Sequence, residues 1–285
     1  MNNKNTDYLI NSIQDNYGVS STVNGFDAGA AVKKIVSFLK HALVETGKKG
    51  YVLGISGGVD STCAGRLSAI AVDELNSECG ENTYHFYAVR LPYGVQADES
   101  DVDLAMLFIN PTEDLSINIK DSTDSMHQSV VFALGGGFSE SKEDFNKGNV
   151  KARARMMAQY EIAGLTDTLV VGTDHRSEYI TGFFTKWGDG ACDIAPLSHL
   201  NKRKVRAIAQ YLCAPEQLFN KVPTADLEDG KPQVADEVAL QLSYNEIDDV
   251  LEGNMANVSQ KARARIAEIY SNTKHKRKPP MQLKR

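Results

Sequence analysis

The most informative part of this 285-residue sequence reads Tyr51-Val-Leu-Gly-Ile-Ser56-Gly57-Gly58-Val59-Asp60-Ser61. An apolar strand, residues 51–55, leads into a loop of hydroxyl and glycine residues that opens a helix. In open α/β sheets, ligands bind at the carboxyl ends of the strands, where the free N–H groups of a following helix attract anions. This order of elements therefore predicts a phosphate-binding turn.

The residue types in the turn fit a phosphate. Gly57 and Gly58 let the backbone approach it closely, and Ser56 and Ser61 add hydroxyl donors. The loop matches neither GxxxxGK[ST] nor GxGxxG, so it is not a P-loop or a dinucleotide fingerprint. Asp60 would repel a phosphate unless a cation lay between them, and Mg²⁺ fills that role. The alternative is a tight turn capped by Ser or Asp.

Strands and helices alternate on both sides of this turn. We expect strands at residues 51–55, 85–90, 115–119 and 168–171. We expect helices at residues 6–17, 28–46, 60–75, 98–108, 122–134, 142–163, 199–212 and 244–269, with an irregular stretch at 220–234. Such alternation implies parallel βαβ units. The predicted fold is α/β, a doubly wound parallel sheet with extra helices at both ends of the chain.

The composition excludes several protein classes. Apolar residues make up 42% and charged residues 24% of the chain, which excludes collagen-like, coiled-coil and wholly disordered chains. No segment approaches the ~18 apolar residues of a membrane helix, and the first residues lack a signal-peptide core. The four cysteines form no CxxC pair, and His175 and the other five histidines show no metal-ligand spacing. We expect a cytoplasmic protein with no membrane partner and no histidine metal site.

The charge is unevenly distributed along the chain. The net charge is −6, but residues 274–285 carry six Lys or Arg and no acid, so residues 1–273 carry −6 − 6 = −12. This acidity argues against a general nucleic-acid-binding protein. The basic tail is either a solvated terminus or a local cationic surface.

The turn SGGVDS resembles the pyrophosphate loop of the ATP pyrophosphatase superfamily, whose members split ATP between its α and β phosphates to adenylylate a substrate. GMP synthetase, asparagine synthetase, tRNA-thiolating enzymes and NAD synthetase belong to it, and the loop alone does not choose among them. Further motifs resemble, in order and over roughly residues 5–282, those of bacterial ammonia-dependent NAD synthetase. They are Phe145-Asn-Lys-Gly-Asn-Val-Lys-Ala-Arg153-Ala-Arg155-Met, Val171-Gly-Thr173-Asp174-His175-Arg-Ser-Glu178, Phe184-Thr-Lys186-Trp-Gly-Asp189-Gly, Pro196-Leu, Lys202-Arg203, Pro223-Thr224-Ala-Asp226-Leu and His275-Lys276-Arg-Lys-Pro-Pro.

The resemblance implies one NAD synthetase domain over residues 1–285, with a Rossmann-like core, adenine nucleotide alpha hydrolase-like in type, at about residues 48–215. It implies ATP contacts at Gly54, Ile55, Ser56, Gly57, Gly58, Val59, Asp60, Ser61, Thr173, Lys202 and Thr224. Contacts to nicotinic acid adenine dinucleotide (deamido-NAD) are implied at Arg153, Lys186, Asp193, His275 and Lys276. Asp60 and Glu178 are expected to hold Mg²⁺. Lys186 and Asp189 are the expected catalytic residues, with Asp189 as the acceptor of a proton from ammonium.

Several of these residues also have ordinary structural interpretations. Glu178 follows an apolar strand and should lie at the same sheet edge as Ser56, but an isolated Glu on an early helical turn is often a surface residue favoured by the helix dipole. Arg153 and its basic neighbours would ordinarily form a solvated helix face. Asp189 lies in a Gly-Asp-Gly sequence that is typical of a turn. For the tail, only His275 and Lys276 are assigned to substrate, which leaves Arg277 among the solvated charges.

The implied reaction has two steps. The carboxylate of deamido-NAD attacks the α-phosphate of ATP, and ammonia then displaces AMP from the resulting adenylate to give NAD. The alternatives are a tRNA thiolase, which would need a cysteine pair at the site, a GMP-synthetase-like enzyme with a different C-terminal domain, and a non-catalytic nucleotide-binding module. Free ammonia is the expected nitrogen source, because no cysteine lies in a recognisable glutaminase context and the motifs fill the chain.

Two further expectations concern dynamics and assembly. Residues 96–100 and 220–234 lack periodicity and contain Gly, Pro or acidic residues, so we expect them to order over ATP and substrate. The N-terminal helices are amphipathic and the family is homodimeric, so a symmetric homodimer is expected.

Overall fold

The central strand of the sheet is β1 (Gly50–Gly54), whose side chains are almost completely buried. It pairs in parallel with β2 (His85–Arg90) on one side and with β4 (Leu169–Val170) on the other, and β2 pairs in parallel with β3 (Glu113–Ser116). The strand order is therefore β3-β2-β1-β4. The computed structural model describes residues 3–19, 25–95, 98–225, 228–230 and 234–283.

Alternate side chains of β1 pack on opposite faces of the sheet. Tyr51 and Leu53 belong to a core cluster with α2 (Ala28–Thr46), α3 (Val59–Cys79), α4 (Glu99–Ile109) and α8 (Lys202–Tyr211). Val52 belongs to another cluster with α6 (Glu140–Thr166), on the opposite face. Side chains alternate along a strand, so a strand that is apolar at every position requires helices on both faces. The predicted doubly wound α/β fold is confirmed.

The strand order reverses direction at β1. From β1 the chain proceeds to β2 and β3 on one side, and it returns to place β4 on the other side. At such a switch point the loops after the two neighbouring strands diverge and leave a crevice at the carboxyl edge of the sheet. The turn at residues 56–58 follows β1, and residues 171–175 follow β4, so the fold brings both predicted segments to this edge.

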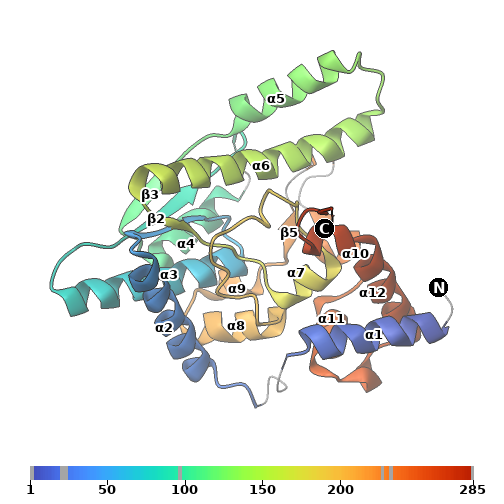
Figure 1. Ribbon diagram of the computed structural model, residues 1–285, viewed down its shortest axis with the longest axis horizontal. Helices are drawn as coiled ribbons and strands as arrows, with labels where there is room; N and C mark the ends of the chain where they lie inside the picture. The colour runs from blue at the N-terminus through green and yellow to red at the C-terminus, as the bar shows by residue number, and fades with distance from the viewer. Residues whose placement is uncertain (1–2, 20–24, 96–97, 226–227, 231–233, 284–285) are drawn as a thin grey trace.

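The two ends of the chain form a second core beside the sheet domain. Helix α1 (Asn3–Tyr17) packs against α11 (Tyr244–Glu252) and α12 (Gln260–Asn272), as Figure 1 shows. Ile180 of α7 (Arg176–Thr181) is buried in the same cluster. Because α7 follows β4 directly, this helical core is attached to the carboxyl edge of the sheet.

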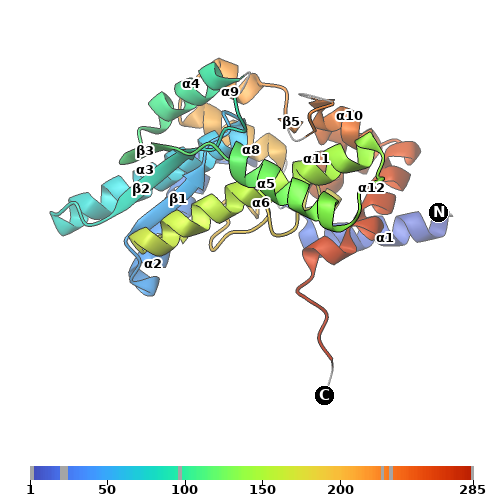
Figure 2. The same cartoon turned by 90° about the horizontal axis from the view of Figure 1, so that it is seen from above.

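The remaining elements are short or peripheral. Helix α5 (Lys120–Ala133) packs along α6 to form a helical hairpin on one side of the molecule (Figure 1). Helices α9 (Glu216–Asn220) and α10 (Asp236–Leu240) flank an antiparallel pair of two-residue strands, β5 (Thr224–Ala225) and β6 (Val234–Ala235). After the 3₁₀ turn Lys274–Arg277 the chain extends away from the body (Figure 2). Among the described helices, none combines the length and the apolar character required to cross a bilayer.

Three predicted elements differ in the structure. The third strand covers Glu113–Ser116 rather than residues 115–119, because α5 already begins at Lys120. The helix predicted at residues 244–269 is two helices: Gly253 adopts a left-handed conformation (φ 78°), which ends α11, and the hydroxyl of Ser259 caps α12. The stretch 220–234, predicted to be irregular, contains strand β5 and ends in β6, with which β5 pairs. Residues 96–97, 226–227 and 231–233 of the two predicted mobile segments lie outside the described residues, so that expectation stays a prediction.

Candidate active site

The turn after β1 is shaped by its two serines and two glycines. Ser61 Oγ lies 3.1 Å from Ser56 Oγ and donates to the carbonyl of Gly58 at 3.2 Å. Gly57 has φ 73°, and a Cβ there would lie 3.0 Å from backbone atoms of α4. Only glycine fits both constraints. The turn therefore presents backbone N–H groups at the start of α3, as an anion-binding turn requires.

A cluster of polar side chains lies beside this turn. Asp60, on the first turn of α3, has its Oδ2 2.6 Å from Lys202 Nζ at the start of α8. Its Oδ1 lies 3.5 Å from His175 Nε2, which is also 3.5 Å from Glu178 Oε2. One ligand atom from each of Asp60, His175 and Glu178 lies within 4.8 Å of the others. The structure brings together the two predicted Mg²⁺ ligands.

The pKa values in the cluster show how strongly these groups interact. Burial and then the charge of Asp60 raise the pKa of Glu178 well above its usual value. Burial would also raise the pKa of Asp60, but Lys202 and His175 outweigh it and hold the pKa below its usual value. Burial lowers the pKa of His175 to about 3, so this ring is neutral at physiological pH. Lys202 supplies positive charge to a pair of carboxylates that would otherwise repel each other.

His175 is the member of the cluster that sequence reasoning missed. Its side chain is fully buried, and neither ring nitrogen has a hydrogen-bond partner among the described residues. A metal site is predicted from sequence when several histidines recur at ligand spacing, whereas the partners of His175 are the carboxylates of Asp60 and Glu178. Its place in the motif with Glu178 was the available signal.

The carboxylate of Asp248 connects three helices behind the cluster. It accepts a hydrogen bond from Ser177 Oγ at 2.6 Å and from the N–H of Arg203 at 2.8 Å. Ser177 Oγ in turn accepts from the N–H of Lys202 at 3.1 Å. Asp248 on α11 therefore holds the first turns of α7 and α8, which carry Glu178 and Lys202. No sequence signal marked Asp248, since its partners lie 45 and 71 positions away.

A second buried contact joins the cluster to residues after β6. The hydroxyl of Tyr244 donates to Asp236 Oδ2 at 3.0 Å and lies 3.5 Å from Glu178 Oε1. Lys202 Nζ lies 4.9 Å from the centre of the Tyr244 ring. The cluster is thus closed on one side by a buried aromatic side chain.

A second group of predicted residues lies around the loop 182–190 and the basic tail. Lys186 Nζ donates to the carbonyls of His275 and Lys278 at 2.9 and 3.0 Å. Lys276 Nζ donates to the carbonyls of Gly182 and Phe184 at 2.9 and 2.6 Å. These contacts fix the start of the tail against the loop.

Arg277 was expected to be a solvated charge, and this expectation is wrong. Its guanidinium is half-buried and donates to the carbonyls of Tyr179 and Ile180 at the end of α7 and to Thr273 Oγ1. A guanidinium has five donors, so one side chain can satisfy several carbonyls that a helix end leaves without partners.

Asp174 connects the two groups electrostatically. Burial, followed by the charges of Asp189 and Asp60, raises its pKa well above the usual value, and Lys276 opposes this. Asp174 therefore lies within reach of both the cluster and the tail. Asp189 itself is exposed, and its Oδ1 accepts from the N–H of Thr185 at 3.0 Å.

The other predicted residues occupy different positions. Thr173 follows β4 at the same sheet edge as Ser56, and Thr224 lies in β5. Arg153 is exposed on α6 with a guanidinium nitrogen 3.4 Å from the carbonyl of Lys186, which places it in the second group. Asp193 accepts from the N–H of Val170 at 2.8 Å, so its carboxylate is engaged with the edge strand β4.

The two segments that are predicted to be mobile, residues 96–100 and 220–234, contact each other through their described ends. Lys221 Nζ lies 3.0 Å from Asp98 and 2.7 Å from Asp101. Because Asp101 also packs against Gly57, these segments meet beside the phosphate-binding turn.

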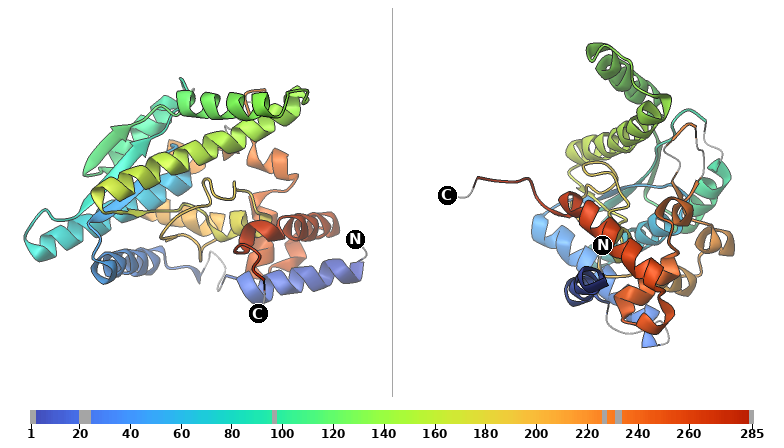
Figure 3. Two further views of the ribbon diagram at one scale, coloured as in Figure 1. Left: turned by 45° about the horizontal axis from the view of Figure 1, so that its top comes forward. Right: turned by 90° about the vertical axis from the view of Figure 1, so that its right-hand side faces the viewer.

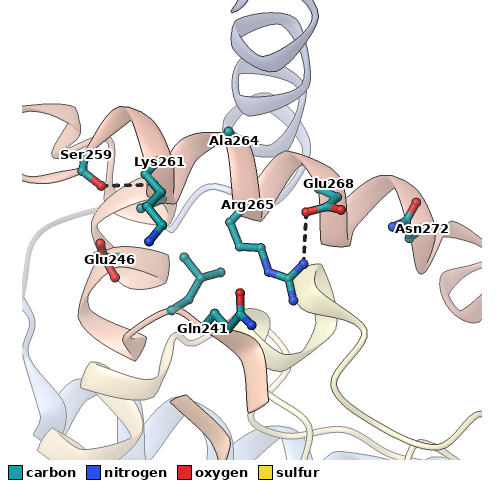
Figure 4. Close-up of a pocket in the computed structure, with 10 residues that line it drawn as sticks. Gln241, Glu246, Ser259, Lys261, Ala264, Arg265, Glu268 and Asn272 are labelled. Carbon is teal, nitrogen blue, oxygen red and sulfur yellow. Dashed lines mark hydrogen bonds and ion pairs between the residues drawn. The ribbon is translucent and has the colours of Figure 1, made fainter. Parts of the chain in front are cut away.

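A cavity of about 690 Å³ lies elsewhere, between α12 and the start of α11. Its lining includes Lys261 and the ion pair Arg265–Glu268, as Figure 4 shows. None of the residues assigned to ATP, substrate or Mg²⁺ lines it, so this cavity is separate from the candidate active site.

The role of Asp248 leads to a prediction about stability. Asp248→Ala leaves the Ser177 hydroxyl and the Arg203 N–H buried without an acceptor, which should lower the free energy of unfolding by about 2–4 kcal/mol. Asp248→Asn keeps an acceptor for one of these two donors, which contact different carboxylate oxygens, and should cost about half as much. Burial raises the pKa of Asp248 to about 6. The unfolded value is near 4, so the wild type should lose stability relative to Asp248→Asn as the pH rises from about 4 to about 6. Urea denaturation measures both effects, and equal losses in the two variants would contradict the assignment.

Comparison with known proteins gives the family of the chain. The family model described as NAD synthase matches residues 31–280. The NH(3)-dependent NAD(+) synthetase of Aliivibrio salmonicida (strain LFI1238) is 55% identical over 257 residues, which cover 89% of this chain and 92% of that protein. The NH(3)-dependent NAD(+) synthetase of Vibrio parahaemolyticus serotype O3:K6 (strain RIMD 2210633) is 55% identical over 272 residues, or 94% of this chain and 97% of that protein.

Solved structures of similar proteins agree with this family assignment. The NAD+ synthetase from Burkholderia pseudomallei superposes with a TM-score of 0.79 at 38% identity and covers 96% of this chain and 97% of its own. The NMN synthetase from Francisella tularensis gives a TM-score of 0.77 at 32% identity, covering 90% of this chain and 99% of its own. The family match at residues 31–280 extends over the sheet, the turn at residues 56–61 and helices α11 and α12. This chain belongs to the NAD synthase family.

Proposed function

We propose that this chain amidates deamido-NAD with ammonia at the expense of ATP and releases NAD, AMP and pyrophosphate. The observation that carries the proposal is the cluster of Asp60, Glu178 and Lys202 at the mouth of the phosphate-binding turn. A module that only bound nucleotide would need the turn but not two partly buried carboxylates beside it. The names of the relatives at 55% identity support the ammonia-dependent reaction.

In the first step, an oxygen of the nicotinate carboxylate attacks the α-phosphorus of ATP. The bond from that phosphorus to the α–β bridging oxygen breaks, and its electron pair leaves with pyrophosphate. Residues Gly54 to Ser61 supply N–H and hydroxyl donors to the phosphates, and Thr173, Lys202 and Thr224 contact them from other elements. Lys202 is placed to neutralise the charge that develops on the leaving pyrophosphate.

The carboxylates of Asp60 and Glu178 fit a divalent cation. Asp60 Oδ1 is buried without a hydrogen-bond partner among the described residues, and Glu178 lies close enough to share one ion with it. Mg²⁺ prefers carboxylate and phosphate oxygens, and when bound here it would offset phosphate charge and orient ATP. Asp60 and Glu178 are the residues that would hold it.

In the second step, the nitrogen of neutral ammonia attacks the activated carbonyl carbon. The carbon–oxygen bond to AMP breaks with its electron pair on AMP, and the nitrogen loses a proton to solvent water. Asp189 is the proposed acceptor of the proton from ammonium, because it lies in the same loop as Lys186. Burial and then the charge of Asp189 raise the pKa of Asp174, so the two carboxylates interact.

Deamido-NAD is proposed to bind in the second group of residues. Arg153 offers a planar fork that suits a carboxylate or phosphate, and Lys186, His275 and Lys276 surround the start of the tail. Asp193 is proposed as a polar contact at the edge of β4. A cationic surface on an otherwise acidic chain favours polyanionic substrates.

Residues 1–285 are proposed to act as one domain, with its ATP pyrophosphatase core at about residues 48–215. The protein is proposed to act in the cytoplasm, without nucleic-acid or membrane partners. Four free cysteines, of which Cys63 is buried and Cys79 is exposed, support a reducing compartment.

A homodimer is also proposed, with the α5–α6 hairpin as its interface. The hairpin exposes a row of large apolar side chains, and Figure 3 shows it standing out from the body. They include Met126, Val130, Phe132, Leu134 and Phe145, and Phe132 is 88% exposed. A second hairpin packed by two-fold symmetry would bury these side chains.

The metal assignment predicts that Asp60→Asn and Glu178→Gln each lower kcat by about 100-fold or more, because each removes one anionic ligand. The fold should remain, as circular dichroism would verify. Glu161→Gln changes an exposed glutamate on α6 and serves as the matched control. A wild-type rate in Asp60→Asn or Glu178→Gln at ordinary Mg²⁺ concentration would refute the assignment.

The reaction itself predicts pyrophosphate release from ATP and Mg²⁺ only when deamido-NAD is present, and NAD formation only when ammonium is added. Raising the pH from about 7 toward 9 at fixed total ammonium should lower the apparent KM for ammonium, since only NH₃ is nucleophilic. Equal rates with glutamine and ammonium would overturn the nitrogen source. Nicotinic acid mononucleotide is tested in parallel, because one structural neighbour is an NMN synthetase; a higher kcat/KM for it would replace the dinucleotide as substrate.

The dimer proposal predicts that the wild-type protein sediments as a dimer at micromolar concentration and that Phe132→Asp shifts it to a monomer. Val44→Asp introduces the same charge at an exposed apolar position on α2 and should leave the dimer intact. A monomeric wild type, or a dimeric Phe132→Asp, contradicts the proposed interface.

A further inference from the structure

Arg277 joins the start of the basic tail to two helices of the helical core. Its guanidinium donates to the carbonyls of Tyr179 and Ile180, in the last turn of α7, at 3.3 and 3.1 Å. It also donates to Thr273 Oγ1 at 2.7 Å and to the carbonyl of Tyr270 near the end of α12. A guanidinium holds its N–H donors in a rigid planar fork, so these four acceptors fix the side chain in one position. Beyond this point the chain leaves the body (Figure 2).

Three tyrosine rings lie together at this junction. The carbon atom of the Arg277 guanidinium lies 4.2 Å from the centre of the Tyr270 ring. The ring of Tyr17, at the end of α1, lies 6.1 Å from the Tyr270 ring and 5.5 Å from the ring of Tyr179, centre to centre. Aromatic rings exclude water, and hydrogen bonds are stronger where water is excluded. Helices α1, α7 and α12 therefore all stabilise the position of Arg277.

Two lysines also attach the tail, and both have a second assignment. Lys276 Nζ donates to two carbonyls of the loop 182–184, and Lys186 Nζ donates to the tail carbonyls of His275 and Lys278. Both lysines are also proposed to contact deamido-NAD, which is a polyanion. A phosphate or carboxylate oxygen is a stronger acceptor for an ammonium than a neutral carbonyl is. When the substrate binds, these lysines are thus expected to exchange carbonyl acceptors for substrate oxygens.

The contacts of Arg277 do not compete with the substrate in this way. Its acceptors are three carbonyls and one hydroxyl, and none of them belongs to a residue assigned to substrate or metal. Among the described residues, Arg277 pairs with no carboxylate. Carbonyls at helix ends that lose their donor are left without a partner, which is costly where they are buried. Arg277 is therefore the tail contact that persists while the lysines change partners.

Helix α7 does not depend on Arg277 for its own position. Ser177 Oγ donates to Asp248 at 2.6 Å, and the N–H of Arg176 donates to the carbonyl of Leu200 at 2.7 Å. These contacts fix the first turn of α7, which carries Glu178. Loss of the Arg277 side chain should therefore release the tail and leave the proposed metal ligand in place.

We propose that Arg277 is a positioning residue, which keeps His275 and Lys276 at the substrate while Lys186 and Lys276 exchange carbonyl acceptors for the anionic groups of deamido-NAD. The proposal rests on the proposed function, because it uses the substrate assignments of these residues. Arg277 acts through the position of the tail. Its loss should weaken binding of the dinucleotide and not the binding of ATP at the turn after β1.

The test compares Arg277→Gln with Arg263→Gln. Arg263 is a matched control, because its partly buried guanidinium also donates to backbone carbonyls of the helical core, those of Met255 and Val258. Both variants should lose some stability, since both leave carbonyls without donors. Only Arg277→Gln should raise the KM and the calorimetric Kd for deamido-NAD, by about tenfold or more, with the KM for ATP changed by less than about twofold. Arg277→Lys should restore part of the affinity, because an ammonium reaches fewer of the four acceptors.

Release of the tail is measured separately, by trypsin cleavage after Lys274 and Lys276 followed by mass spectrometry. Cleavage requires local unfolding of this turn, so it should be about tenfold faster in Arg277→Gln than in the wild type. In Arg263→Gln the rate of cleavage at these two positions should equal that of the wild type. A purely structural loss of stability would raise it in both variants.

An unchanged affinity for deamido-NAD in Arg277→Gln, an equal loss in Arg263→Gln, or a parallel rise in the KM for ATP would overturn the role of Arg277, even if NAD synthesis is confirmed. Calorimetry and trypsin cleavage need no turnover, so failure of the proposed reaction gives a different result. A protein that binds deamido-NAD in a manner that depends on Arg277 but forms no NAD would refute the reaction and leave the role of Arg277 in place.

Discussion

The site is built around the ion pair between Asp60 and Lys202. Two carboxylates, Asp60 and Glu178, lie close together and largely out of water, an arrangement that repels itself unless positive charge is near. Lys202 provides that charge at 2.6 Å and is itself buried, so neither partner tolerates loss of the other. The positions of α3, α7 and α8 follow from this requirement, because each helix contributes one of these three residues to the same point.

The sheet and the helical core each supply part of this arrangement. β1 and β4 place the first turns of α3 and α7 at the switch point, since the loops after neighbouring parallel strands open there. The sheet alone does not fix the first turn of α8. Asp248 on α11 does so through Ser177 and the N–H of Arg203, so the helical core formed by the two ends of the chain controls the position of Lys202. The helices outside the sheet are therefore part of the site.

Sequence reasoning succeeded where chemistry is local. The turn at residues 56–61, its strand and its helix follow from glycine and apolar patterns within a dozen positions, and the family motifs placed Glu178 and Lys202 near it. It failed where a partner lies far away in the chain. His175 was given no role because its partners are carboxylates and not other histidines. Arg277 was assigned to solvent because the α7 carbonyls that it binds lie almost a hundred residues earlier. The bounds of β3 were misplaced because a short, exposed edge strand lacks a clear alternation of apolar and polar residues.

In the proposed site, the Asp60–Lys202 pair also makes the binding of cation and phosphate depend on each other. Without ligands, Lys202 neutralises Asp60; a phosphate that attracts Lys202 leaves Asp60 without a counter-charge unless a cation replaces it. A cation on Asp60 and Glu178, in turn, repels Lys202 and favours its contact with phosphate. Each ligand thus removes the cost of binding the other, and linkage requires the two effects to be equal. A reaction that needs the cation and the phosphate at the same time benefits from this coupling, because Lys202 pairs with either Asp60 or the phosphate but not with both.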